Sequence, residues 1–170
     1  MDIISHGLWG GITLGRKKRS NFIYGFGLSI LPDILGEGIM FSLIFLGVSN
    51  MPSIEQGHPN ITEFPVYVQN FYNATHSLII FLTVFALFWI ITRKPFWLLL
   101  AWGLHIIIDI PTHSFKLFPT PFLWPISDFK INGIPWDNSI VLIPNILLLV
   151  IFYIFWLYKK KLRIKFTKIQ

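Results

Sequence analysis

The stretch that decides the fold is SIVLIPNILLLVIFYIFWLY, residues 139–158. It contains no charged residue, and at about 1.5 Å per helical residue it is long enough to cross a hydrocarbon core of about 30 Å. Further apolar stretches precede it at residues 2–14, 21–48, 75–92 and 95–112. We therefore expect an all-α, multi-pass helical membrane protein with about four to five membrane-embedded helices.

The composition argues for a membrane protein and against a water-soluble one. Of the 170 residues, 54% are hydrophobic and 13% are charged, and the mean hydropathy is +0.62. A soluble domain carries about 25% charged residues. Cysteine is absent, so any metal must be bound by histidine nitrogen and carboxylate oxygen. The length fits a single helical membrane domain over residues 1–158, followed by a basic tail over residues 159–170.

The positive charges predict how the chain is oriented in the cell membrane. Basic residues gather at residues 16–19, at residues 93–94 and in the tail, next to apolar stretches. Such clusters mark the cytoplasmic side, so we predict a cytoplasmic C-terminal tail. The two loops at residues 49–74 and 113–138 then lie on the extracytoplasmic side.

The same distribution of charge excludes one class of partner. The formal charge is +6, but no basic groove with interleaved stacking residues is present, so we predict that the chain binds the lipid bilayer and no nucleic acid.

Two further local features shape the expected fold. Residues 49–74 contain Pro, Asn, Gln and Glu and predict a loop, and Pro32 predicts a break or kink within residues 21–48.

Ionisable residues inside the apolar stretches indicate the functional site. A central Asp costs about 2.5–3.5 kcal/mol in a membrane helix, so such residues need partners. His105 and Asp109 are four residues apart and share one helical face, and Asp33 and Glu37 repeat this spacing. Counted from the nearest basic cluster at the helical rise, these positions lie at similar depths, about 15–26 Å into the membrane. The residues so placed are His6, Asp33, His76, His105 and Asp109.

A shared depth for imidazoles and carboxylates predicts a divalent-metal site, with zinc as the first candidate. A histidine nitrogen and a carboxylate one helical turn apart can bind the same cation. We predict His6, Asp33, His76, His105 and Asp109 as ligands. The metal would activate a water, and Glu37, or a carboxylate such as Asp109 that the metal does not fully engage, would accept the proton.

Five motifs follow one another along the chain: His6, Leu31-Pro32-Asp33-Ile34, Thr75-His76-Ser77-Leu78, His105-x-x-x-Asp109 and Leu123-Trp124-Pro125. Their order resembles the membrane-bound metal-dependent hydrolases of the YdjM-like, LexA-regulated type. The resemblance covers about residues 1–127 and implies a multi-pass protein whose His and Asp residues bind metal. Two elements depart from that family: Leu35 stands where it has a second acid, and Phe71-Tyr72-Asn73 replaces a His-Arg-Gly stretch.

The chain is also distantly similar to zinc-dependent phospholipase C and the related single-strand nucleases, which are helical enzymes that cleave phosphodiesters. This similarity implies His113 as a further metal ligand. Together these features predict a membrane-bound metal-dependent hydrolase acting on a phosphoester or lipid-linked substrate near the outer leaflet.

Two alternatives remain open at this stage. A metal-ion or proton transporter would use the same buried residues, although transporters spread polar positions across the membrane and often contain a repeat. A catalytically inactive scaffold stabilised by metal is the other. The sequence leaves the oligomeric state unknown.

Overall fold

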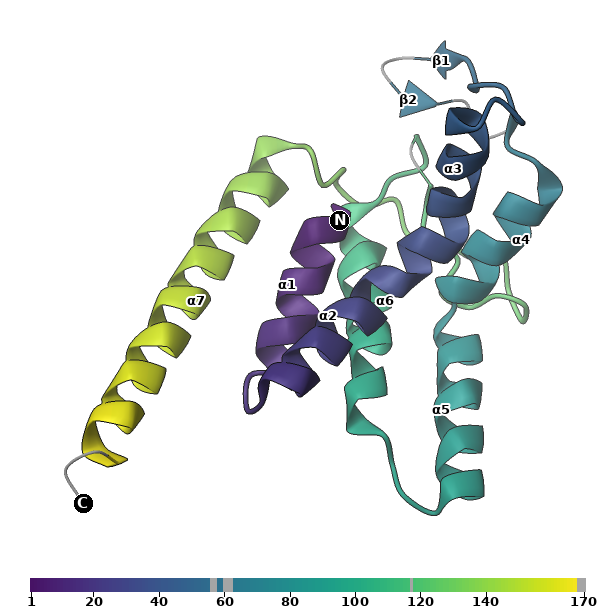
Figure 1. Ribbon diagram of the computed structural model, residues 1–170. Coiled ribbons are helices and arrows are strands. Elements are labelled where there is room, and N and C mark those ends of the chain that lie inside the picture. The colour runs from purple at the N-terminus through teal and green to yellow at the C-terminus, as the bar shows by residue number, and fades with distance from the viewer. Residues whose placement is uncertain (56–57, 60–62, 117, 168–170) are drawn as a thin grey trace.

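The computed structural model describes residues 1–55, 58–59, 63–116 and 118–167, and helices dominate them (Figure 1). The short antiparallel strands β1 (Ile54–Glu55) and β2 (His58–Pro59) are the only β-strands in these ranges. The predicted all-α class is therefore confirmed. The helices are α1 (Ile3–Leu14), α2 (Arg19–Asp33), the π-helix η1 (Ile34–Gly38), α3 (Ile39–Phe45), α4 (Val66–Thr75), α5 (Leu78–Thr92), the 3-10 helix η3 (Trp97–Leu99), α6 (Leu100–Thr112) and α7 (Ser139–Thr167).

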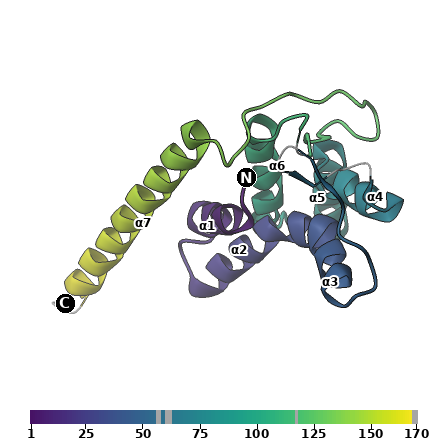
Figure 2. The same ribbon diagram turned by 90° about the horizontal axis from the view of Figure 1, so that it is seen from above.

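The helices form a central group with α7 to one side. In Figure 1, α1, α2 and α6 lie at the centre, α3, α4 and α5 lie on one side of them, and α7 lies on the other. Figure 2 shows α7 projecting away from this group. The α1–α2 turn, the turn after α5 and the C-terminal end of α7 all lie at the lower end of Figure 1. The three basic clusters of the sequence therefore share one end of the molecule.

Two helices are long and apolar enough to cross a membrane, Arg19–Phe45 and Ser139–Lys161. A third candidate is the pair α4 and α5, which is bent by 61° and meets the same test when taken together. The helix over Trp97–Thr112 is apolar but shorter. By length and composition the described residues thus contain two to three candidate spans, and the higher number expected from the sequence remains a prediction.

Small residues let α1 and α2 approach at backbone distance. A Cβ added at Gly10 would lie 2.4 Å from the carbonyl oxygen of Gly25, and one added at Gly25 would lie 2.7 Å from that of Gly10. Small residues are typical of helix contacts in membranes, because close backbone approach supplies packing energy where lipid gives no hydrophobic drive. This contact seats α1, and with it His6, against the half of α2 that leads to Asp33.

Pro32 does not break its helix. The helix runs on from α2 through η1 into α3, and Figure 1 shows that it bends there. The five residues after Asp33 form a π-helix, a local widening that often occurs where a helix is interrupted in its regular bonding. The sequence predicts a break or a kink at Pro32, and the structure shows a kink in a continuous helix.

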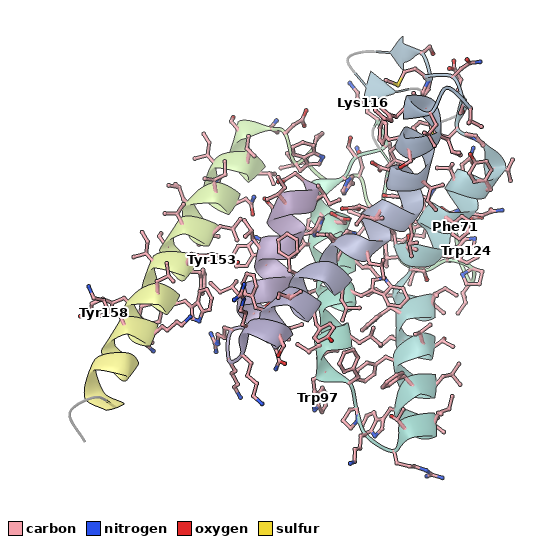
Figure 3. All side chains as sticks on the ribbon, in the orientation of Figure 1. Phe71, Trp97, Lys116, Trp124, Tyr153 and Tyr158 are labelled. Carbon is pink, nitrogen blue, oxygen red and sulfur yellow. The ribbon has the colours of Figure 1, made fainter. Side chains whose placement is uncertain are left out.

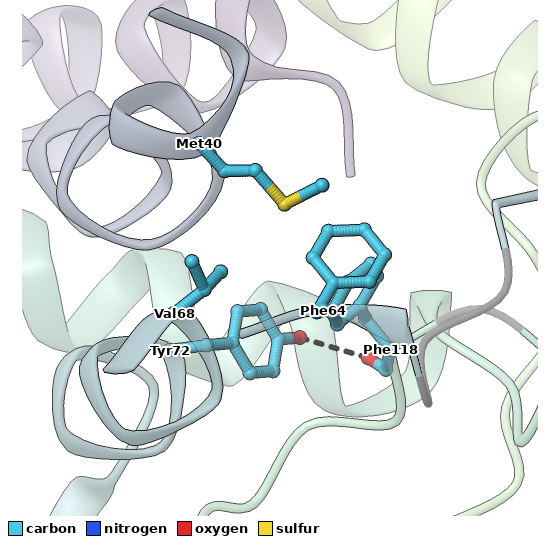
Figure 4. Close-up of a cluster of buried hydrophobic side chains, with 5 residues drawn as sticks. All are labelled: Met40, Phe64, Val68, Tyr72 and Phe118. Atoms are coloured by element: carbon cyan, nitrogen blue, oxygen red, sulfur yellow. Dashed lines mark hydrogen bonds between the residues drawn. The ribbon is translucent and has the colours of Figure 1, made fainter. Parts of the chain in front are cut away.

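The prediction of a loop over residues 49–74 is wrong from Val66 onward, where α4 begins. The buried residues Val68, Tyr72 and Thr75 lie at helical spacing and face α3 and η1. Polar residues on the other face lower the hydropathy of this segment, which is why it reads as a loop. Figure 4 shows the buried apolar cluster that holds α4 in place: Met40, Phe64, Val68, Tyr72 and Phe118.

Polar contacts attach α7 to α1. Asn145 accepts a hydrogen bond from the indole of Trp9 at 2.8 Å and donates one to Ser5 Oγ at 2.8 Å. The helix continues past Tyr158, beyond which we predict the basic tail, and extends through Thr167. The last residues of that tail, 168–170, lie outside the described residues. The division into a membrane domain and a tail therefore stays a prediction.

Candidate metal centre

Two helices and one helix–helix corner bring four predicted ligands together in the interior. Asp33 ends α2, His76 follows α4, and His105 and Asp109 lie one turn apart on α6. One ligand atom from each of these residues lies within 4.8 Å of the others. His76, His105 and Asp109 are at most 1% exposed. The convergence expected from their depth is thus found, and the group has the composition of a metal site.

Five of the six distances among the four ligand atoms lie between 3.0 and 3.7 Å, close to the edge length of a coordination tetrahedron. His76 Nε2 and His105 Nε2 are 3.0 Å apart, and Asp33 Oδ1 lies 3.3 and 3.4 Å from them respectively. Asp109 Oδ2 lies 3.0 Å from His105 Nε2 and 3.7 Å from His76 Nε2. Zinc bonds of about 2.0–2.2 Å in a tetrahedron give edges of about 3.3–3.6 Å.

Backbone carbonyls fix which nitrogen of each imidazole points into the centre. His105 Nδ1 lies 2.7 Å from the Ser29 carbonyl, and His76 Nδ1 lies 3.1 Å from the Tyr72 carbonyl. Because a carbonyl only accepts, each Nδ1 carries a proton, so in the neutral imidazole each Nε2 presents a lone pair. Metal-binding histidines are oriented in this way. Two lone pairs and two carboxylate oxygens then face one another, and a cation satisfies all four.

The corner between α4 and α5 places His76. Ser77 caps α5 by accepting a hydrogen bond from the Ile80 amide at 3.1 Å, and its hydroxyl donates to the Trp124 carbonyl. The Trp102 indole donates to the Thr75 carbonyl at 2.6 Å. The corner is therefore held by α6 and by the segment that contains Trp124, both of which can be followed in Figure 3, where Trp124 is labelled.

Asp109 connects the four-residue group to a second set of nitrogen atoms through its other oxygen. Oδ1 lies 2.8 Å from His6 Nε2 and 3.3 Å from His113 Nδ1, and the Met1 amino group also contacts it. His6 is fully buried, and its Nδ1 has no hydrogen-bond partner among the described residues. His6 and His113 thus lie beside the centre at the other oxygen of Asp109, and the His6 ring also lies against the His105 ring, with centroids 3.8 Å apart.

Two further features of the site are the position of Glu37 and the exposure of the clustered side chains at the surface. Glu37 lies in η1 and is partly buried, one helical turn after Asp33. The Asp33 side chain is 18% exposed, whereas the side chains of His76, His105 and Asp109 are at most 1% exposed. Asp33 is therefore the ligand through which the centre meets the surface.

Sequence reasoning missed two groups that shape the centre. The Ser29 carbonyl orients His105, and a backbone group leaves no signature in the residue type. Tyr72 stacks on His76 with ring centroids 4.0 Å apart. Its position four residues before His76 would have indicated this contact had the segment been recognised as helical.

Comparison with models of protein families, with curated proteins and with solved structures gives no match for this chain. The case for a metal centre therefore rests on its geometry. What the chain displays is a set of apolar helices around a buried His/Asp group able to hold a metal ion.

Proposed function

We propose that this chain is a membrane-bound metal-dependent hydrolase that acts on a phosphoester or lipid-linked substrate near the outer leaflet. The observation that carries the proposal is the convergence of Asp33, His76, His105 and Asp109, whose ligand atoms lie within 4.8 Å of one another with both Nε2 atoms directed inward. A divalent ion held there, with zinc the first candidate, would lower the pKa of a bound water toward about 7 and polarise an ester oxygen.

His6 and His113 extend the proposed ligand set. Both contact Asp109 Oδ1, while Asp109 Oδ2 faces the four-residue group. One carboxylate can thus serve two adjacent cations, or His6 and His113 can hold Asp109 in place for a single cation. Metal analysis distinguishes the two arrangements by stoichiometry.

Proton transfer requires a group near the centre that the metal does not engage. Glu37 occupies such a position, because it follows Asp33 by one turn and lies partly buried. We assign it the role of proton acceptor, with Asp109 as the alternative. Glu37→Gln should therefore retain the metal and lose turnover, whereas Asp109→Ala should lose both.

The shared end of the three basic clusters supports the proposed orientation (Figure 1). With that end cytoplasmic, residues 113–138 and the β1–β2 pair fall on the extracytoplasmic side. Additional membrane embedding of α1 and α6, beyond the two to three candidate spans, is part of the same proposal.

The decisive experiment combines metal analysis with an activity screen. Purified wild type, His105→Ala and Asp109→Ala are compared for bound metal and for cleavage of a panel of phosphoesters. Asp128→Ala is the matched control, because Asp128 is exposed. Metal and turnover in wild type and control, with both lost in the two site variants, support the hydrolase.

The same purified protein tests the transport alternative. Metal flux into liposomes without ester cleavage would overturn the hydrolase and support transport. Convergence of the described polar residues on one centre favours the hydrolase, since a transport pathway needs such residues at several depths.

A further inference from the structure

A one-ion centre of the proposed kind carries no net charge with which to attract an anionic substrate. The two ligands Asp33 and Asp109 balance one divalent cation, and the two imidazoles are neutral in the orientation described above. A phosphoester is negatively charged. Its recognition therefore needs a cationic group beyond the ligands.

A pocket beside the centre offers that group. It has a volume of about 100 Å³, several times the roughly 30 Å³ share of one water molecule. Among the described residues that line it, Lys130 alone is charged, and the carboxamides of Gln69 and Asn73 add hydrogen-bonding groups. With a cation, amides and no lining carboxylate, the pocket favours an anion.

Tyr72 joins this pocket to the metal centre. Its ring lines the pocket and stacks on the His76 imidazole, with ring centroids 4.0 Å apart and planes inclined by 23°. Its hydroxyl donates to the Phe118 carbonyl at 2.8 Å, which fixes the ring (Figure 4). One aromatic side chain thus separates the pocket from a proposed metal ligand.

We infer that the pocket lined by Lys130, Asn73, Gln69 and Tyr72 binds a phosphate group of the substrate, with Lys130 supplying the charge. The inference rests on the proposed function for the source of that phosphate and deepens it by naming the anionic group that is recognised. Residues 49–74 contain no Lys or Arg, and residues 113–138 contain only Lys116 and Lys130. Few cations are therefore available on the proposed extracytoplasmic side.

Lys116 provides a matched control. It carries the same charge in the same connecting segment, is exposed, and is not among the residues that line the pocket. Lys130 is half-buried. A general effect of net charge would act through both lysines, whereas a phosphate site would act through Lys130.

The test titrates inorganic phosphate into zinc-loaded protein in a non-ionic detergent and follows binding by calorimetry. We expect Lys130→Gln to raise the dissociation constant for phosphate by about tenfold or more, as for loss of a charge-assisted hydrogen bond. Lys116→Gln should change it less than about twofold, and Lys130→Arg should retain most of the affinity. Asn73→Asp, which adds a negative charge from α4, should also weaken binding.

Zinc content, measured on every variant, shows that the centre is intact. Equal phosphate affinity in wild type, Lys130→Gln and Asn73→Asp would overturn the inference, and so would an equal loss in Lys116→Gln and Lys130→Gln. If Lys130→Gln does not fold, Lys130→Arg and Asn73→Asp carry the test alone. Phosphate binding is measured independently of turnover. If phosphate binding is weakened in Lys130→Gln and not in Lys116→Gln, but no ester is cleaved, the phosphate site is supported and the proposed hydrolase activity is not.

Discussion

Replacing Asp109 by asparagine tests the metal centre most directly, because the side chain keeps its size and loses its charge. Asp109 uses both oxygens, Oδ2 toward His105 at 3.0 Å and Oδ1 toward His6 at 2.8 Å. Asparagine has one oxygen and can serve only one side. Loss of an orienting partner alone weakens metal binding about 10–100-fold, so we expect at least about a hundredfold loss for a direct ligand.

The expected change in the unfolding midpoint follows from the linkage between zinc binding and the stability of the fold. Zinc at a hundred times the wild-type dissociation constant stabilises the fold by about 2.7 kcal/mol. After a hundredfold loss of affinity the same zinc concentration contributes about 0.4 kcal/mol. The difference corresponds to about 5–9 °C in the unfolding midpoint for a chain of this length.

The assay compares thermal unfolding of the purified protein with chelator and with zinc. Each protein is its own reference, so an effect of the substitution on the metal-free fold cancels in the difference. Asp128→Asn, at an exposed position, should keep the full zinc-dependent shift. A full shift in Asp109→Asn would refute the reasoning, because it would show that the carboxylate charge contributes nothing to metal binding.

Three further outcomes are expected. Gly10→Ala places a Cβ 2.4 Å from the Gly25 carbonyl oxygen, so we expect it to lower the free energy of unfolding by about 1–3 kcal/mol and to reduce the zinc content. Gly27→Ala is the control, because a Cβ there meets no atom within 4 Å. Equal unfolding midpoints for the two variants would contradict the α1–α2 contact. Asn145→Leu removes the hydrogen bonds to Trp9 and Ser5 and should lower the free energy of unfolding by about 1–3 kcal/mol. Mass spectrometry should find unchanged zinc in this variant, and a loss of zinc would show that α7 supports the centre. Chelation should leave the helical circular dichroism signal unchanged, since the α1–α2 packing does not involve metal, and a collapse of that signal would contradict this.

The convergence of the polar residues was accessible to sequence reasoning. The rise of a helix is fixed, so distance from a basic cluster gives an expected depth for His105 or Asp33 in a membrane. Ionisable groups at one depth in an apolar medium need partners, and each other is the available choice. The i and i+4 spacing of His105 and Asp109 also gave their common face without any structure.

Two features could not be predicted from the sequence in the same way: the helix α4, and the uninterrupted course of the helix through Pro32. Hydropathy detects a helix surrounded by lipid, but α4 buries only one face and carries polar residues on the other. Its stability comes from packing against α3 and Phe118, which are distant in sequence. The helix continues past Pro32 into a π-helical turn, and that turn packs against α4, which is distant in sequence.

The amino-acid sequence by itself determined the helical class of the chain and the identities of the clustered residues, because composition and helical spacing are properties of the local chain. Only the tertiary structure decided their direction: which imidazole nitrogen faces inward, which oxygen of Asp109 meets which histidine, and that Lys130 shares Tyr72 with the centre. The physical reason is that spacing along a helix gives a height and an angle on that helix alone. The rotation of one helix against another is set by side chains and carbonyls that meet only on folding.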